Sequence, residues 1–410
     1  MNAHRFRDLI LIFGAALGMA GLAWLAGFAT ALYVAPSGPP VPADIQAPRN
    51  FGLYGEVWRM VDHEFYGKRP SEADVTADAI EGMVDALGDP FSAYVNSDDG
   101  KTRDDAFAPR FVGGLGAWIE PVADGALILA TPARSPAAKS LLPGDTIVAV
   151  GEDELAGMGT AELVAKLAGT PGAADRLIVL HDNDRGEVVE IKRETVPSPA
   201  VELRRPEPGV AYIRLPVLNT ATVRALDAAL ASLATRPATA LLLDLRDNPG
   251  GDVTSIRAAA GRFMGGVAWV EVDEDGAITE QAADDVGAPG TAVPDRVIVL
   301  VNAGTSGGAE ILAGALHDNR GAKLVGQSSF GKGSLQTVTA LSDRSRIRLT
   351  TGHWRTPAGS EVEGVGLRPD LDVAVSDDDR DAGRDPQLDA ALATARGEAV
   401  TGREGSSSGG

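Results

Sequence analysis

The sequence from Arg296 to Gln336 predicts a strand, a tight turn, a helix and a second strand in direct succession. The apolar run Arg296–Val301 is short and rich in β-branched residues, which is typical of a buried strand. Glycine, threonine and serine then fill positions 304–308, and an apolar helical face follows with Glu310 in its first turn. Such a turn lies at the carboxyl end of a strand, where open α/β sheets bind their ligands.

One lysine, Lys332, lies between two glycines after the second predicted strand, Ala322–Gly326. A lysine can act as the base for a serine nucleophile when desolvation removes its proton, so that no histidine is needed. Lowering its pKa by about 3 from the ordinary value of about 10.4 costs roughly 4 kcal/mol. Lys332 must therefore be buried to act as a base. The alternative is a solvated loop lysine.

These residues resemble those of the C-terminal processing (tail-specific) serine peptidases. In that family a strand leads into a Gly-Ser-Ala-Ser-Ala-Ser-Glu turn, and Phe-Gly-Lys-Gly-Ser/Thr-x-Gln follows the helix. The corresponding segments here lie at residues 304–310 and 330–336. The resemblance implies that Lys332 is the catalytic base and that Gln336 is its supporting amide.

The same resemblance implies that the family's catalytic serine has been replaced. Its position corresponds to Gly307, which lies 3 residues before Glu310 and 25 residues before Lys332. Ser306 is the substitute nucleophile that the sequence offers. Adjacent side chains at a helix start diverge by about 100°, so we expect the Ser306 hydroxyl to point away from Lys332 unless the glycines let the turn shift.

A second turn is expected after Ala240–Leu245, a fully apolar run that predicts a central strand. Alternating strands and helices over residues 200–373 predict an α/β core with a mainly parallel sheet. The motif at 246–251, Arg-Asp-Asn-Pro-Gly-Gly, resembles the family's Leu-Arg-x-Asn-Pro-Gly-Gly. By resemblance, a backbone N–H of this turn and that of the residue after the nucleophile form the oxyanion hole. The candidates are Gly250 or Gly251, together with Gly308. Taken alone, the motif is a common turn.

A β-rich module is expected at residues 110–194, and it resembles a PDZ domain. A glycine-rich turn opens it, and a Pro-Gly-Asp turn precedes the predicted strand Thr146–Val150. Successive glycine N–H groups can bind a terminal carboxylate while the peptide adds as a strand to the sheet edge. The simpler interpretation is a hairpin turn and an ordinary Gly-Asp turn. The residues expected to bind a polypeptide C-terminus are Gly113, Gly114, Leu115 and Gly116.

The N-terminal stretch Leu9–Ala35 contains 27 uncharged positions, enough to span a bilayer as a helix. Arg5 and Arg7 precede it and favour an inside N-terminus. We expect a single-pass anchor in the inner (cytoplasmic) membrane with the body on the external, periplasmic side. A cleaved signal is the alternative. The predicted order is anchor or signal 1–35, proline-rich linker 36–50, N-terminal helical region 51–109, PDZ-like module 110–194, α/β peptidase core 200–373, and short helix with disordered tail 374–410.

Charge and residue content exclude several classes of function. A net charge of −20 argues against nucleic acid as a partner. The absence of cysteine excludes disulfides and thiolate catalysis. The histidines show no metal-ligand spacing, and a partial phosphate-loop pattern at 326–332 lacks the magnesium-binding hydroxyl because Gly333 follows it. We therefore expect no metal and no cofactor. The sequence leaves open whether the chain forms a homo-oligomer or binds a partner protein.

The resemblance implies two functions that the sequence alone does not separate. The first is an exported, membrane-anchored serine endopeptidase that cuts near protein C-termini and uses Ser306 in an altered turn. The second is a non-catalytic relative in which the PDZ-like module and the remaining cleft hold polypeptide tails or a partner peptidase. Gly307 offers Lys332 no hydroxyl to deprotonate, and in one serine protease loss of the nucleophile costs about a millionfold in rate. We therefore favour weak or absent catalysis.

Overall fold

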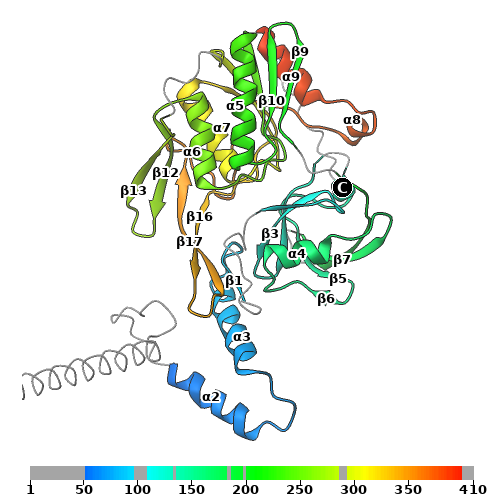
Figure 1. Ribbon diagram of the computed structural model, residues 1–410, viewed down its shortest axis with the longest axis vertical. Coiled ribbons are helices and arrows are strands. Elements are labelled where there is room, and N and C mark those ends of the chain that lie inside the picture. Colours follow the sequence, from blue (N-terminus) through cyan, green and yellow to red (C-terminus); the bar gives the residue numbers. More distant parts are fainter. Residues whose placement is uncertain are drawn as a thin grey trace, which may run out of the picture. The chain divides into compact units, whose positions relative to one another are not determined.

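The computed structural model describes residues 51–96, 109–132, 135–181, 186–196, 200–285 and 293–398 (Figure 1). The predicted membrane segment, the linker and the predicted disordered tail lie outside these residues. In the part of the chain that is described, no helix has the length and apolar character needed to cross a membrane. The chain divides into two compact units, one formed by residues 1–71 with 341–344 and the other by residues 72–340 with 345–410.

In the smaller unit, the first helix of the predicted N-terminal helical region is α2 (Phe51–Glu64). Its apolar side chains recur at helical spacing, yet Tyr54, Val57 and Met60 are exposed. Helix α3 (Glu72–Asp85) begins the larger unit and carries acidic residues in its first turn, as helix starts prefer.

A mainly parallel sheet forms the α/β core of the larger unit, as the sequence predicts. In the described residues its strand order is β18-β15-β14-β11-β10-β9. All neighbours pair in parallel except β9, which is antiparallel to β10 at the edge. The strands are β9 (Glu202–Glu207), β10 (Val210–Arg214), β11 (Ala240–Asp244), β14 (Arg296–Val301), β15 (Lys323–Gly326) and β18 (Leu371–Asp372).

Helices cover both faces of this sheet because its strands are apolar on both sides. In β11, Leu241 and Leu243 pack with the cluster that includes α5 (Thr220–Thr235), α6 (Val253–Phe263) and α7 (Gly308–Arg320). Leu242 packs instead with the cluster that includes α9 (Pro386–Arg396). This alternation follows the two-residue period of a strand. Figure 1 shows α5, α6 and α7 together beside the sheet.

An antiparallel sheet that the sequence largely concealed lies in the same unit. Its longest strand spans Arg346–Arg355. It pairs with β1 at its start and with β12 at its end, and both partners lie far away in the sequence. The strands are β1 (Ala93–Val95), β12 (Val267–Asp273), β13 (Ile278–Ala282), β16 (Ser334–Ala340) and β17 (Arg346–Arg355).

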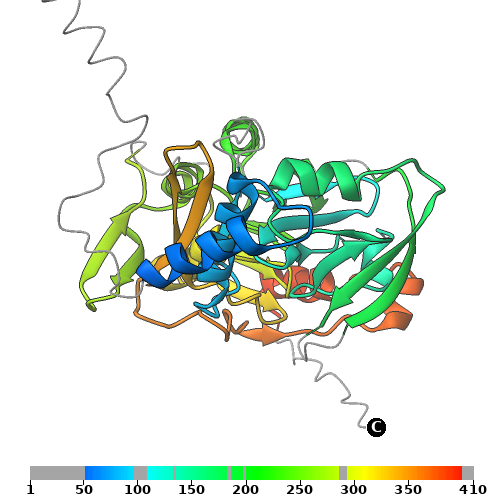
Figure 2. The same ribbon diagram turned by 90° about the horizontal axis from the view of Figure 1, so that it is seen from below.

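The β-rich module at 110–194 forms an antiparallel sheet in the order β2-β3-β4-β5-β7-β8, with β6 paired to β5. Helix α4 (Thr160–Leu167) packs on its strands (Figure 2) and buries Leu163 and Leu167. The strands are β2 (Arg110–Val112), β3 (Ala117–Val122), β4 (Gly125–Ala130), β5 (Thr146–Val150), β6 (Asp153–Glu154), β7 (Ala174–Leu180) and β8 (Gly186–Lys192), and a short 3₁₀ helix, η2, covers Ala137–Lys139.

The chain after the core contains one helix more than expected. Where one short helix was predicted, in the segment 374–410, the described residues contain α8 (Asp377–Asp381) as well as α9. Ser376 begins this helix, because its hydroxyl accepts a hydrogen bond from the N–H of Asp379. The sequence pattern missed α8 because the segment has no apolar face.

Candidate active site

Gly307 lies at the point where the turn after β14 enters α7. Its backbone angles are φ 50° and ψ −112°, in a region that glycine adopts far more readily than other residues. A Cβ placed on Gly307 would meet one neighbour within 4 Å, Lys332 Cδ at 3.8 Å. A side chain at this position would thus extend beside Lys332 without a steric clash. This is the strained strand-to-helix geometry that presents a nucleophile in many hydrolases.

Ser306 is fully buried, and its backbone N–H donates to the carbonyl of Asn248 at 2.9 Å. Its hydroxyl has no hydrogen-bond partner among the described residues, so it does not bond to Lys332. The structure therefore brings Gly307, and not Ser306, to Lys332.

Lys332 is buried, with 8% of its surface exposed. Its Nζ donates to both carboxylate oxygens of Glu120, at 2.7 and 2.8 Å, and lies 4.8 Å from the centre of the Phe91 ring. Burial lowers the pKa of Lys332 below its ordinary value, and the Glu120 carboxylate acts in the opposite direction. The expected burial of Lys332 is confirmed, and its amine makes an ion pair with Glu120.

Glu120 is the residue of this site that the sequence did not reveal. It lies on β3, where all six residues are buried, and its second cationic partner is Arg348 of β17 at 2.8 Å. Burial by itself would raise the pKa of Glu120, but the charges of Lys332 and Arg348 outweigh burial and hold it below 4.5. A signal was present, since a single carboxylate in an otherwise apolar strand needs a buried partner.

Arg348 also joins three parts of the larger unit. Its Nε donates to the carbonyl of Phe91 at 2.7 Å, and a terminal nitrogen donates to the carbonyl of Pro121 at 2.6 Å. Phe91 precedes β1, Pro121 lies on β3, and Arg348 itself is on β17. The surroundings of Lys332 are therefore built from distant segments of the chain.

The Glu310 carboxylate connects the Gly307 turn to the Lys332 loop. One oxygen accepts the N–H groups of Gly307 at 2.8 Å and Lys332 at 2.9 Å. The other accepts the N–H of Gly331 at 2.8 Å and the Ser329 hydroxyl at 2.5 Å. These four donors fix the distance between the two segments that would carry the nucleophile and the base.

Gln336 does not support Lys332. Its amide nitrogen donates to the Ser334 hydroxyl at 2.7 Å, whereas Lys332 Nζ bonds to Glu120. Both Gln336 and Ser334 belong to β16, which starts two residues beyond Lys332. The carried-over role of Gln336 therefore needs correction, since its side chain bonds within its own strand.

The corner at 246–251 contacts the start of α7 closely. An added Cβ on Gly250 would lie 2.7 Å from the nitrogen of Gly308, and one on Gly308 would lie 3.4 Å from the nitrogen of Gly251. The N–H of Gly250 already donates to Asn248 Oδ1 at 2.8 Å. Within the described residues, the N–H groups of Gly251 and Gly308 have no protein acceptor. Of the two candidate glycines in the corner, Gly251 is therefore the one whose backbone N–H can bind a ligand.

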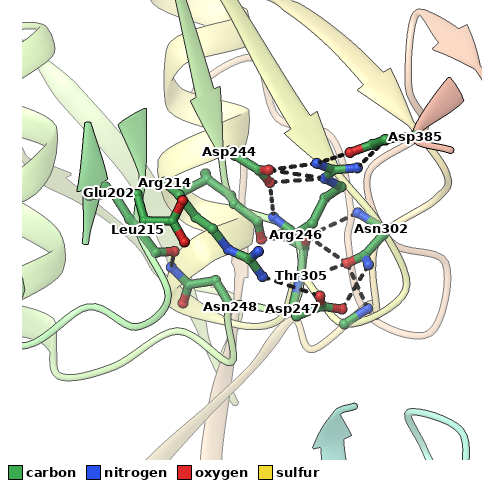
Figure 3. A network of polar contacts seen from close by, with 12 residues as sticks. Glu202, Arg214, Leu215, Asp244, Arg246, Asp247, Asn248, Asn302, Thr305 and Asp385 are labelled. Carbon is green, nitrogen blue, oxygen red and sulfur yellow. Dashed lines mark hydrogen bonds and ion pairs between the residues drawn. The ribbon is translucent and has the colours of Figure 1, made fainter. Parts of the chain in front are cut away.

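A polar network holds the two turns together at the carboxyl ends of β10, β11 and β14 (Figure 3). The Asn302 side chain accepts a hydrogen bond from the backbone N–H of Asp247 at 2.9 Å and donates one to the Asp247 carboxylate at 2.8 Å. The Thr305 hydroxyl donates to the carbonyl of Leu245 at 2.9 Å. Buried Arg246 pairs with Asp244 and with Asp385, the capping residue of α9, at 2.7 and 2.8 Å.

The glycine-rich turn at 113–116 connects β2 to β3. Strand β2 pairs along the start of β3, with Val112 opposite Ala117, and β4 pairs with β3 on its other side. Helix α4 contacts both β2 and β3. Strand β2 is therefore the edge of this sheet next to the glycine-rich turn, and β3 is paired on both sides. An added strand must pair with β2 or displace it.

The fold and the site together define a class of protein. A parallel sheet, a nucleophile-type turn, a buried lysine and a facing pair of backbone donors are the parts of a serine/lysine hydrolase. In this chain the residue of the turn that lies beside Lys332 is Gly307.

Comparison with known proteins places this architecture in a family. The model of peptidase family S41 matches residues 209–373. The carboxy-terminal-processing protease of Bartonella bacilliformis is 31% identical over 336 residues, covering 79% of this chain and 75% of that protein. The chain belongs to the carboxy-terminal processing serine peptidases of family S41.

Other relatives and a solved structure agree with this assignment. The carboxy-terminal processing protease CtpA of Bacillus subtilis is 29% identical, covering 80% of this chain and 70% of that protein. The chain spans 64% of the length of a probable CtpA-like serine protease from Staphylococcus epidermidis. The solved photosystem II D1 C-terminal processing protease superposes with a TM-score of 0.57 at 25% identity, covering 79% of this chain and 87% of that one.

Proposed function

We propose that this protein binds the C-terminal tails of polypeptides and, in the arrangement described, does not cleave them. One observation carries the second half of the proposal: the position that faces Lys332 is Gly307, where an added Cβ would lie 3.8 Å from Lys332 Cδ. No hydroxyl occupies this place. The buried Ser306 hydroxyl, one residue earlier, is not hydrogen-bonded to the lysine.

Two features support a polypeptide tail as the ligand. The relatives from Bartonella and Bacillus are named as carboxy-terminal processing proteases, so the shared core suits an extended chain end. In addition, a Cβ on Gly308 would lie 3.4 Å from the nitrogen of Gly251, and within the described residues neither N–H has a protein acceptor. We assign these two donors to a peptide carbonyl oxygen. We assign the turn at 113–116 to the terminal carboxylate, with the β-rich module acting as a PDZ domain whose tail strand adds beside β2 or replaces it.

We further propose that the protein acts outside the inner membrane and is anchored by residues 9–35. The 27 uncharged positions and the two preceding arginines support this location. The location of the body is measured by adding protease to intact cells and to cells that have been opened osmotically. Digestion of the body only after the outer barrier is opened agrees with the proposal, and protection until the inner membrane is lysed contradicts it.

Tail binding without cleavage is the expected result when the full-length chain is mixed with an unfolded protein that has an apolar C-terminus. Amidation of that C-terminus removes the carboxylate and is expected to weaken binding about 10- to 100-fold, because a charge-assisted set of hydrogen bonds is lost. Binding is measured by fluorescence anisotropy, and cleavage by mass spectrometry of the same mixture. Equal binding of the free and amidated tails would contradict the assignment.

A second candidate function is an endopeptidase that uses Ser306. The observation that favours it is the Ser306 hydroxyl, which is buried and has no partner among the described residues. A buried hydroxyl without a hydrogen-bond partner destabilises the fold, so its presence calls for an explanation such as a catalytic role. The same mixture decides between the two functions. Tail cleavage that disappears in Ser306→Ala would establish the peptidase, whereas intact tails in both proteins leave binding as the function.

A further inference from the structure

Lys332 Nζ is already committed to a hydrogen-bond partner other than a nucleophile. Both Glu120 oxygens lie within 2.8 Å of it. A lysine acts as a base only when its neutral amine presents a lone pair to the hydroxyl, and an ammonium group has none to present. The missing hydroxyl at 307 is therefore one obstacle to hydrolysis, and the state of Lys332 is another.

The groups around Lys332 differ in their effect on its proton. Burial opposes the ammonium form and lowers the pKa of Lys332 overall. Glu120, on β3, acts against burial because it makes an ion pair with Nζ. Glu363 favours the ammonium form from a greater distance, and Arg348, on β17, opposes it. The Phe91 ring adds a cation–π contact at 4.8 Å. Glu120 and Arg348 are each only 3% exposed, so solvent screens these interactions little.

We propose that Glu120 is a second block on hydrolysis, separate from Gly307, because it keeps Lys332 protonated and bonded to itself. Restoring a hydroxyl at position 307 is then insufficient, and neutralising Glu120 is also required. The proposal rests on the proposed function, in which the chain does not cleave the tails that it binds. It also assigns the block to β3, which is part of the module expected to hold the tail.

The block depends on whether the Lys332 amine carries a proton. In a serine/lysine reaction the neutral amine takes the hydroxyl proton as the hydroxyl oxygen forms its bond to the carbonyl carbon, and the carbonyl electron pair moves to the oxygen held by the backbone donors. The lysine later returns that proton to the leaving amine. With Glu120 ionised and bonded to Lys332, the amine already carries this proton.

The test compares the full-length variants G307S and G307S/E120Q. Each is treated with a fluorophosphonate, which labels a serine only when a base activates it, and the label is located by mass spectrometry. We expect labelling at position 307 about 100-fold faster in G307S/E120Q than in G307S at neutral pH, because a general base contributes at least about that factor. The double variant is also expected to reach its full labelling rate at a lower pH.

Matched variants control the comparison. E120Q alone keeps Gly307 and is expected to remain unlabelled, which excludes activation of Ser306 or another serine. If E120Q leaves Arg348 without its carboxylate and the double variant fails to fold, G307S/E120L/R348M removes both charges together and replaces it. Circular dichroism confirms the fold of each variant before labelling.

Two outcomes overturn the proposal. One is equal labelling rates and the same pH profile in G307S and G307S/E120Q, which would mean that Glu120 does not restrain Lys332. The other is no labelling in a folded variant that lacks the Glu120 charge. Tail cleavage by the wild type would overturn the proposed function instead, and it is measured separately on the unmodified chain.

Discussion

Replacing Glu310 with alanine is expected to lower the free energy of unfolding by about 3–5 kcal/mol, one of the largest effects of any single change in this chain. The carboxylate accepts four hydrogen bonds, three of them from backbone N–H groups of Gly307, Gly331 and Lys332. Alanine leaves these donors buried without a partner, and each unpaired buried group costs about 1–3 kcal/mol. Urea unfolding followed by circular dichroism measures the loss.

Glu274→Ala is the matched control, because Glu274 is an exposed carboxylate in the turn between β12 and β13. A change within about 0.5 kcal/mol is expected there. If Glu310→Ala had an effect as small as that of the control, the carboxylate would not hold the Gly307 turn and the Lys332 loop together.

The stability difference caused by Glu310→Ala should also depend on pH. Burial raises the pKa of Glu310 from 4.5 to about 7 in the folded protein, even though its four donors favour the ionised form. A carboxyl group with a raised folded-state pKa contributes most to stability below its unfolded pKa, and this contribution falls as pH rises through the folded pKa. We expect a larger difference between wild type and variant at about pH 5 than at about pH 8. A difference that grows with pH would show that the folded-state pKa lies below 4.5.

Gly251→Ala is expected to destabilise the fold by about 3 kcal/mol or more and to weaken tail binding. A Cβ on Gly251 would lie 1.6 Å from the carbonyl oxygen of Leu218. The two backbones are held together by hydrogen bonds on either side of this point, from Leu218 N–H to the Gly250 carbonyl at 2.6 Å and from Asp252 N–H to the Leu218 carbonyl at 3.3 Å. Alanine can fit only if the corner moves, which also carries its backbone donor away from Gly308.

Gly265→Ala provides the comparison, because a Cβ on Gly265 would meet no atom within 4 Å. Thermal unfolding and tail binding are measured for both variants. Gly265→Ala should leave both close to wild type. Normal stability in Gly251→Ala would show that the corner tolerates displacement, and it would remove the steric basis for the proposed oxyanion pair.

Local sequence patterns predicted the elements that carry the site. The strands predicted at Arg296–Val301 and Thr146–Val150 have the same bounds as β14 and β5. Periodicity succeeds in these segments because strand burial and helix amphipathicity are written into neighbouring residues. Residue type also explains the start of α5, because the Asn219 side chain caps it by accepting from Thr222 N–H at 2.9 Å.

Interactions between distant residues could not be predicted in this way. Lys332 and Glu120 are 212 positions apart, and Arg348 and Glu120 are 228 apart. The antiparallel sheet pairs Ala93 of β1 with Arg348 of β17, and Val270 of β12 with Arg355 of β17, across 255 and 85 positions. No periodic pattern links such residues, because their contact depends on how complete elements pack.

The sequence by itself determined the family, the parallel core, the lysine loop and the glycine at position 307. These follow from residue identity and from short-range periodicity. The tertiary structure decided which charged group Lys332 meets, which glycine of the corner has a free donor, and that β2 occupies the edge of β3. The physical reason is that the charge state of a buried lysine, and whether a strand edge is free to pair, depend on neighbours in space. Folding brings those neighbours from remote parts of the chain.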